Sequence, residues 1–266
     1  MFENGFDILQ SKGALVLAFA AALLILERLF PMARPLVATH LTDMAAMIWR
    51  MVKNLSLAGV NGVLSWLIVV PVSAAAASYA LDWRPDGWSD MHGLVIDILI
   101  LDCWIYWWHR ANHEIQFLWR FHEVHHLDEF LDVTSALRFH AGEVFLSSLV
   151  RAGVIFVLDM PLTSVIAFET VVLFGAIFHH SNVSLPPVLE RVLSKIIVTP
   201  SIHWVHHHAI RQDTDSNYAT FLSVWDRLFG SRSATRRWAD MPIGVEQRRD
   251  EGLAGLLVRP FRPRRR

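Results

Sequence analysis

The segment GLVIDILILDCWIYWWHRANHE, residues 93–114, joins an apolar run to two histidines. Residues 93–108 are apolar enough to lie in a bilayer as a helix, and their tryptophan-rich end is typical of the belt where a membrane helix meets water. His109 and His113 follow at the i and i+4 positions, which share one face of a helix. The segment therefore predicts a membrane helix that presents two imidazoles where it leaves the lipid.

The composition of the whole chain supports a membrane location. The 266 residues are 53% hydrophobic and 18% charged, with a mean hydropathy of +0.35, which is more apolar than ordinary soluble domains. Four further runs approach the length of a membrane span: residues 13–30, 57–81, 144–159 and 162–178. We therefore expect an all-α integral membrane protein with about four to five transmembrane helices. Residues 144–178 form either two of these spans or one re-entrant hairpin.

Basic residues set the expected topology. Four of them lie between the first two spans, namely Arg28, Arg34, Arg50 and Lys53. The next loop carries only Arg84 beside three acids, so the positive-inside rule places the basic loop in the cytoplasm, and residues 109–143 and 179–266 follow it there. Glu3 and Asp7 stand where a signal peptide would be basic, so we expect the first span to remain. Short loops and the lack of a retention signal favour a bacterial inner membrane.

We expect one domain over residues 1–230, with a histidine-rich region at about 102–230, and an arginine-rich cytoplasmic tail over 231–266. The tail holds ten arginines against four acids. It either binds anionic lipid head groups or is a disordered, solvated end, which we favour for residues 259–266. Cys103 is the sole cysteine, which excludes an intrachain disulfide and argues against a thiolate metal cage. A net charge of −1 without an aromatic and basic module speaks against nucleic-acid binding.

More histidine clusters follow along the chain: His122, His125 and His126, then His179 and His180, then His203, His206, His207 and His208. Neutral imidazoles packed together need partners and charged ones repel each other, whereas a metal ion satisfies both conditions. Eight or more imidazoles exceed the four ligands of a single zinc ion, so the count predicts two metals in a cytoplasmic helical cap. A nitrogen-only dinuclear site at a membrane surface suggests iron that uses dioxygen, although the residues alone leave zinc open.

The boxes HRANH, FHEVHH and HWVHHH, with DTDSNYATFLSVWDRLFGS at 213–231, resemble the fatty acid hydroxylase/sterol desaturase superfamily of membrane-bound, histidine-box, non-haem di-iron oxygenases. The resemblance extends from about Asp102 to Gly230. It implies two iron ions that activate O2 and hydroxylate or desaturate a membrane lipid such as a fatty acyl chain or a sterol. Position by position, it implies these metal ligands: His109, His113, His122, His125, His126, His180, His203, His206 and His207.

The resemblance also implies a partner. No haem-binding domain is recognisable in the chain, so electrons would come from a separate ferredoxin or cytochrome b5-like protein with its reductase. In LRFHAGE, Ala141 replaces the usual proline, although the residues around it match the family pattern. The sequence leaves open whether three other histidines are ligands: His140, His179 and His208.

Three residues are candidates for orienting the ligands: Asp102, Tyr106 and Asn217. A carboxylate inside a membrane span is costly enough to suggest a function. Asp102 lies one turn before Tyr106 on the way to His109, so we predict that it orients an imidazole. The alternative is a carboxylate that snorkels towards the membrane surface or forms an ion pair with Arg151. Asp226, in VWDRLFG, either orients a ligand as well or stabilises the local structure.

Two other functions remain open. His122-Glu123-x-x-His126 matches the motif of zinc metallohydrolases, in which the glutamate is the general base. The downstream box lacks that glutamate, and a one-zinc enzyme leaves the other boxes unexplained. A non-enzymatic metal-binding membrane protein would instead place its ligands within the spans.

Overall fold

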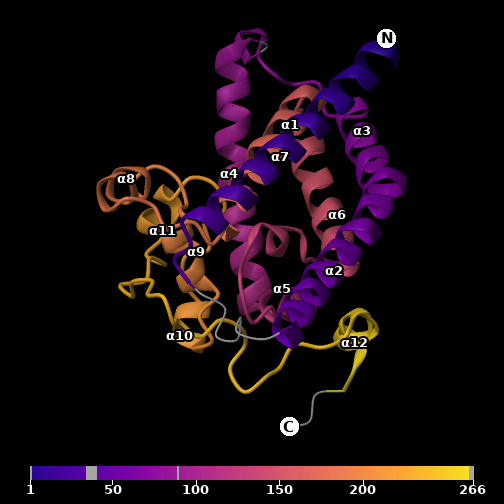
Figure 1. Cartoon of the computed structure of the whole chain (residues 1–266). Coiled ribbons are helices and arrows are strands. Elements are labelled where there is room, and N and C mark those ends of the chain that lie inside the picture. Colours follow the sequence, from indigo (N-terminus) through magenta and orange to yellow (C-terminus); the bar gives the residue numbers. More distant parts are fainter. Residues whose placement is uncertain (1, 34–40, 89, 264–266) are drawn as a thin grey trace.

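A computed structural model of the chain describes residues 2–33, 41–88 and 90–263 (Figure 1). The long helices are α1 (Phe2–Leu29), α2 (Leu41–Leu64), α4 (Met91–Glu114), α6 (Ala141–Val157) and α7 (Leu162–His180). The shorter ones are η1 (Ser65–Val69), α3 (Val70–Ser78), η2 (Asp86–Trp88), α5 (Gln116–His126), η3 (Val133–Leu137), α8 (Pro187–Leu193), α9 (Pro200–His206), α10 (Arg211–Thr214), α11 (Val224–Leu228), α12 (Leu253–Val258) and η4 (Arg259–Phe261). Among the described residues the only strand-like contacts are isolated bridges, so the all-α prediction is confirmed there.

Three stretches of helix in the described residues are long and apolar enough to cross a membrane: Met44–Ser78, Met91–Glu114 and Leu162–His180. Helix α6 has 17 residues, slightly fewer than the about 20 that span a bilayer. Residues 144–178 fall on two separate helices, α6 and α7, joined by a short turn. The predicted total of four to five spans therefore depends on α1 and α6.

The second span contains Pro71 but does not break. Proline lacks an amide N–H and its ring clashes with the carbonyl of the preceding turn. Residues Ser65–Val69 form a π-helical segment immediately before α3, which begins with Val70 and Pro71. The wider π turn accommodates the misfit, as insertions of this kind do in kinked helices. The span accordingly runs from Met44 to Ser78, longer than the predicted run.

One end of the bundle gathers the elements that carry histidines. The end of α4, the end of α7, α5 and α9 meet there, next to the first turns of α2 (Figure 1). Ion pairs connect the elements at this end, since Arg50 of α2 binds Asp128 at 2.8 Å and also pairs with Asp132. The Glu27 carboxylate of α1 accepts a hydrogen bond from the backbone N–H of Asn182 at 3.1 Å. These contacts tie the helices together around the histidines.

The prediction of a disordered end is wrong for residues 259–263. Helix α12 packs its fully buried Leu256 against Leu57 and Val124, and η4 follows it directly. Asp250 forms ion pairs with both Lys53 and the buried Arg138. Because these partners lie on the helix bundle, the segment after residue 230 packs against the histidine-rich region. Arg34, His40 and residues 264–266 lie outside the described residues.

Candidate metal centre

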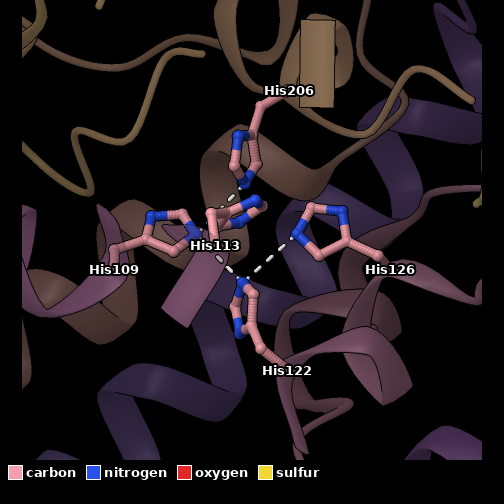
Figure 2. Close-up of side chains that lie close together, drawn as sticks. All are labelled: His109, His113, His122, His126 and His206. Atoms are coloured by element: carbon pink, nitrogen blue, oxygen red, sulfur yellow. Dashed lines mark hydrogen bonds between the residues drawn. The ribbon is translucent and has the colours of Figure 1, made fainter. Parts of the chain in front are cut away.

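Nine buried imidazoles form two adjacent groups. The first group contains His109, His113, His122, His126 and His206 (Figure 2), and the second contains His125, His180, His203 and His207. Within each group the candidate ligand nitrogens all lie within 4.8 Å of one another. The structure thus brings together all nine residues predicted as ligands, and it divides them into the two sets that two metal ions would require.

Helix geometry explains how each His-x-x-His-His motif contributes residues to both groups. At 3.6 residues per turn, residues i and i+4 lie nearly above one another, whereas i+3 points to the other side of i. On α5, His122 and His126 therefore enter the first group and His125 enters the second. At α9 the assignment is reversed, since His203 and His207 enter the second group and His206 the first. The rings of His126 and His207 stack at a centroid distance of 4.3 Å and form a shared wall.

Backbone carbonyls hold several of the imidazoles in one tautomer. The Nδ1–H of His109 donates to the carbonyl of Tyr218 at 2.8 Å, and that of His206 donates to Ser216 at 2.6 Å. The Nε2 atom of each ring must then carry a lone pair, yet the two Nε2 atoms lie 3.1 Å apart. Two lone pairs cannot share a hydrogen bond. A cation between them removes the conflict.

A carboxylate holds a third ring of the same group. The Nδ1–H of His122 donates to Glu143 at 2.8 Å, so its Nε2 atom also faces inward as a lone pair. This Nε2 lies 3.1 Å from that of His109 and 3.2 Å from that of His126, along the dashed lines in Figure 2. Three inward lone pairs on neighbouring rings form a ready set of metal donors.

Burial disfavours the protonated form of five of the nine rings. Desolvation, reinforced by neighbouring imidazoles, holds their pKa well below the ordinary histidine value: His125, His126, His203, His206 and His207. A metal ion can supply positive charge where a proton is disfavoured.

The nitrogen spacing fits metal coordination. Two nitrogens that bind one ion at about 2.1 Å and subtend roughly 90–110° would be about 3.0–3.4 Å apart. Nε2 pairs at this spacing include His109 and His206 at 3.1 Å in the first group, and His180 and His203 at 3.0 Å and His203 and His207 at 3.1 Å in the second. A set of imidazole nitrogens suits iron, copper, nickel or zinc, so the residues present fit two such ions.

The predicted role of Asp102 is wrong. Its carboxylate accepts hydrogen bonds from the indole N–H of Trp225 at 2.7 Å and from the backbone N–H of Leu222 at 3.1 Å. It therefore anchors the loop before α11 to α4 instead of orienting an imidazole. The alternative pairing with Arg151 is also wrong, because Arg151 pairs with Glu169 of α7 at 2.9 Å.

Tyr106 and Asn217 act on the loop that orients the ligands rather than on the ligands themselves. The hydroxyl of Tyr106 bonds Ser231 at 2.8 Å, and Ser231 donates in turn to Asp226 at 2.8 Å. Asn217 adopts a left-handed backbone with φ of 51°, donates to the carbonyl of Ile202 and accepts from the N–H of Ser233. This loop carries the two carbonyls that hold His109 and His206. Asp226 accepts from the N–H of Ala219, which agrees with the local-structure interpretation.

Besides the carbonyls of Tyr218 and Ser216, sequence reasoning missed other contacts that orient ligands. Glu143 holds His122, the carbonyl of Arg138 accepts from His125 at 3.1 Å, and Asp215 lies 3.3 Å from the Nδ1 atom of His113. The match of LRFHAGE to the family pattern was the signal for the first two. No spacing rule pointed to Asp215, because its partner lies about a hundred residues away.

The three histidines whose role the sequence left open, His140, His179 and His208, lie outside both groups. His208 bonds Asp213 at 2.7 Å, and His140 caps α6 by accepting from the N–H of Gly142 while donating to the carbonyl of Leu257. His179 packs against His203, with 3.9 Å between the centroids of the two rings. The side chain of His92 is exposed at the surface.

A cavity of about 530 Å³ opens from the two groups between the long helices. It reaches His109 and His122 of the first group and His125, His180 and His203 of the second. Along α7 its wall runs from Phe168 to His180, which corresponds to about 18 Å at 1.5 Å per residue. About half of the lining residues are aliphatic or aromatic, and the ion pair of Arg151 with Glu169 also lines the cavity. The cavity can therefore hold a lipid chain alongside the imidazoles.

Comparison with known proteins gives a consistent picture. The family model described as fatty acid hydroxylase matches residues 94–231, just over half of the chain, and this range contains all nine histidines. The chain is similar to ornithine lipid hydroxylase OlsE of Rhizobium tropici, at 29% identity over 195 residues, which are 73% of this chain and 58% of the relative. No solved structure matches the chain.

Two other relatives come from animals. Alkylglycerol monooxygenase of Danio rerio is 34% identical over 131 residues, covering 49% of this chain and 28% of the relative. Lathosterol oxidase of Mus musculus is 29% identical over 151 residues, covering 55% and 47%. The chain spans less than two thirds of the length of each of these relatives.

Proposed function

The chain belongs to the fatty acid hydroxylase family, and on that premise we propose that it oxidises a membrane lipid with dioxygen at a di-iron centre. The reaction is hydroxylation or desaturation of a C–H bond in a fatty acyl chain, a sterol or a related lipid. The names of the relatives, a lipid hydroxylase, a monooxygenase and a sterol oxidase, support this reaction class. The apolar helices support a membrane protein.

One observation supports the proposed metal centre above all others. Imidazoles whose Nδ1–H groups are committed to carbonyl or carboxylate acceptors point their Nε2 lone pairs at one another at about 3.1 Å. Such an arrangement is unfavourable without a cation. Two iron ions, one for each group, would supply the redox chemistry with dioxygen, with electrons from an external ferredoxin or cytochrome b5-like protein and its reductase.

The residues of the chain would bind the metal ions, orient the imidazoles and shield the site from water. Glu143 and the carbonyls of Ser216 and Tyr218 hold the imidazoles of the first group in the tautomer that leaves Nε2 free. The apolar walls of the cavity exclude water from the imidazoles and guide a lipid chain to them. Entry from the bilayer would be lateral, between the long helices. We place the histidines and the C-terminal segment in the cytoplasm, with a bacterial inner membrane as the location.

The zinc hydrolase alternative finds less support. Its general base would be Glu123, but the carboxylate of Glu123 accepts from Arg259 at 3.0 Å and is held by the C-terminal segment. The alternative also uses only His122 and His126 of the nine imidazoles. A carrier of metal ions would place its ligands along a path through the spans, whereas these groups lie at one end of the helix bundle.

The proposal can be tested by metal analysis. The full chain would be purified in mild detergent after growth with iron, iron and zinc per chain would be quantified, and Mössbauer spectra would be recorded. We expect two iron ions per chain as a coupled pair. Lipid profiles of cells with and without the gene should then differ by an oxygenated or unsaturated lipid. One firmly held zinc ion and no iron would contradict the proposal and favour the hydrolase.

A further inference from the structure

Two asparagine side chains face the cavity with buried polar atoms that have no partner. Asn112 of α4 is 1% exposed, and in the described structure neither its Oδ1 nor its Nδ2 atom makes a hydrogen bond. Asn61 of α2 donates through Nδ2 to the carbonyl of Phe139 at 2.8 Å, but its buried Oδ1 atom also lacks a partner. Both residues line the cavity that opens from the imidazole groups.

An unpartnered buried amide is costly to the fold. It loses its hydration and gains no hydrogen bond in return, whereas a leucine of similar size would add apolar contacts at that position. A residue that served only packing would therefore not be an asparagine. The cost is recovered if a ligand in the cavity makes the missing hydrogen bonds.

Both amides lie at the metal end of the cavity. Asn112 stands between His109 and His113 on α4, and it shares the cavity-facing stripe with Ile105 and Trp108. Glu143 adds a further acceptor, because its Oε2 atom is buried without a partner while Oε1 accepts from His122. Away from the imidazoles the wall carries apolar residues such as Phe168 and Val172, together with the Arg151–Glu169 ion pair.

The balance of donors and acceptors identifies the chemistry of the missing ligand. At the metal end of the cavity Asn61 Oδ1, Asn112 Oδ1 and Glu143 Oε2 accept, and Asn112 Nδ2 donates. A further unpartnered donor in the wall, Arg151 Nε, belongs to the ion pair with Glu169 on α6 and α7. We infer that these residues bind an O–H or N–H donor at the polar end of a lipid, so that this end, rather than the middle of an alkyl chain, lies beside the metal ligands. This inference rests on the proposed function for the identity of the ligand as a substrate.

The test measures binding and needs no turnover. The metal-loaded full chain in phosphatidylcholine nanodiscs is titrated with 12-bromo-1-dodecanol, 12-bromododecylamine or 1-bromododecane, whose bromine quenches tryptophan fluorescence; Trp108 lines the cavity. The alcohol and the amine distinguish hydroxyl from ammonium donors, and the bromoalkane has no donor. The variants are Asn112→Leu, Asn61→Leu and, as a control in the apolar wall, Val172→Ala.

We expect the wild-type chain to prefer the alcohol or the amine over the bromoalkane. Asn112→Leu should reduce that preference about tenfold without weakening the binding of the bromoalkane, since one buried hydrogen bond corresponds to roughly that factor. Val172→Ala should weaken the binding of all three probes to a similar extent. If Asn112→Leu does not fold, Asn112→Asp should shift the preference towards the amine, because a carboxylate favours an ammonium donor.

The inference is overturned if the wild-type chain shows no preference, or if Asn112→Leu and Asn112→Asp bind all three probes as the wild type does. The amides would then hold only ordered water. Failure of the proposed function has a different signature. A chain that contains zinc and oxidises nothing can still show the donor preference, and an active di-iron enzyme can lack it.

Discussion

His125 and His180 face each other through Nε2 atoms 3.1 Å apart, although each ring donates its Nδ1–H to a backbone carbonyl. The acceptors are the carbonyls of Arg138 and Ala176, at 3.1 Å and 2.8 Å. The local backbone thus selects the tautomer that makes the two rings repel each other in the absence of a cation. The same arrangement occurs in the first group between His109 and His206, and several predictions depend on it.

Removing one ligand of the second group should remove one metal ion. In His180→Ala the second group loses the nitrogen that lies within 3.1 Å of both His125 and His203, so we expect the metal content to fall from two ions to one per chain. His179→Ala is the matched control, because this neighbouring histidine belongs to neither group. The measurement is elemental analysis of the purified variants. An equal loss of metal in both would show that His180 is not a ligand.

Loss of the carboxylate behind His122 should weaken metal binding without removing a ligand. Glu143→Ala frees the Nδ1–H of His122, and we expect the metal affinity to fall by about 10- to 100-fold, as for other carboxylates behind metal-binding imidazoles. Competition with a chelator measures the affinity. Glu169→Gln changes a glutamate that pairs with Arg151 and should leave the affinity unchanged. Wild-type affinity in Glu143→Ala would refute the role of the carboxylate.

Asp102 should contribute to stability rather than to metal binding. Asp102→Ala leaves the half-buried indole N–H of Trp225 without its acceptor, which we expect to cost about 1–3 kcal/mol of folding free energy. Thermal unfolding of the metal-loaded chain measures the loss. The metal content should stay at two ions per chain, because Asp102 touches no imidazole. A variant with normal thermal stability and reduced metal content would restore the original prediction for Asp102.

The C-terminal segment should be required for a stable metal end. Asp250→Ala removes the carboxylate that pairs with both Lys53 and the fully buried Arg138. An uncompensated buried charge costs about 3–5 kcal/mol, so we expect a markedly lower unfolding temperature. The carbonyl of Arg138 orients His125, and metal retention should therefore fall as well.

The control for this experiment is Asp240→Ala, which changes an exposed acid in the same segment and should have little effect. Limited proteolysis followed by metal analysis would report both stability and retention. If Asp250→Ala behaves like Asp240→Ala, the segment covers the metal end without stabilising it.

The membrane helices and the metal-binding histidines were accessible to sequence reasoning because both depend on spacing along one helix. An apolar run of span length predicts α4 or α7, and histidines at i, i+3 and i+4 predict ligands on α5 whatever packs against it. The composition and the count of imidazoles then indicate a membrane protein with two metals.

The partners of Asp102, the division of the nine imidazoles and the packing of the C-terminal segment required the tertiary structure. Asp102 meets Trp225 across 123 residues, and Asp250 meets Arg138 across 112. Local periodicity shows which face of a helix a residue occupies but not which distant element covers that face. The position of α9 opposite α5 assigns His206 to the first group and His203 to the second, because each group is completed by donors from helices that only the folded chain brings together.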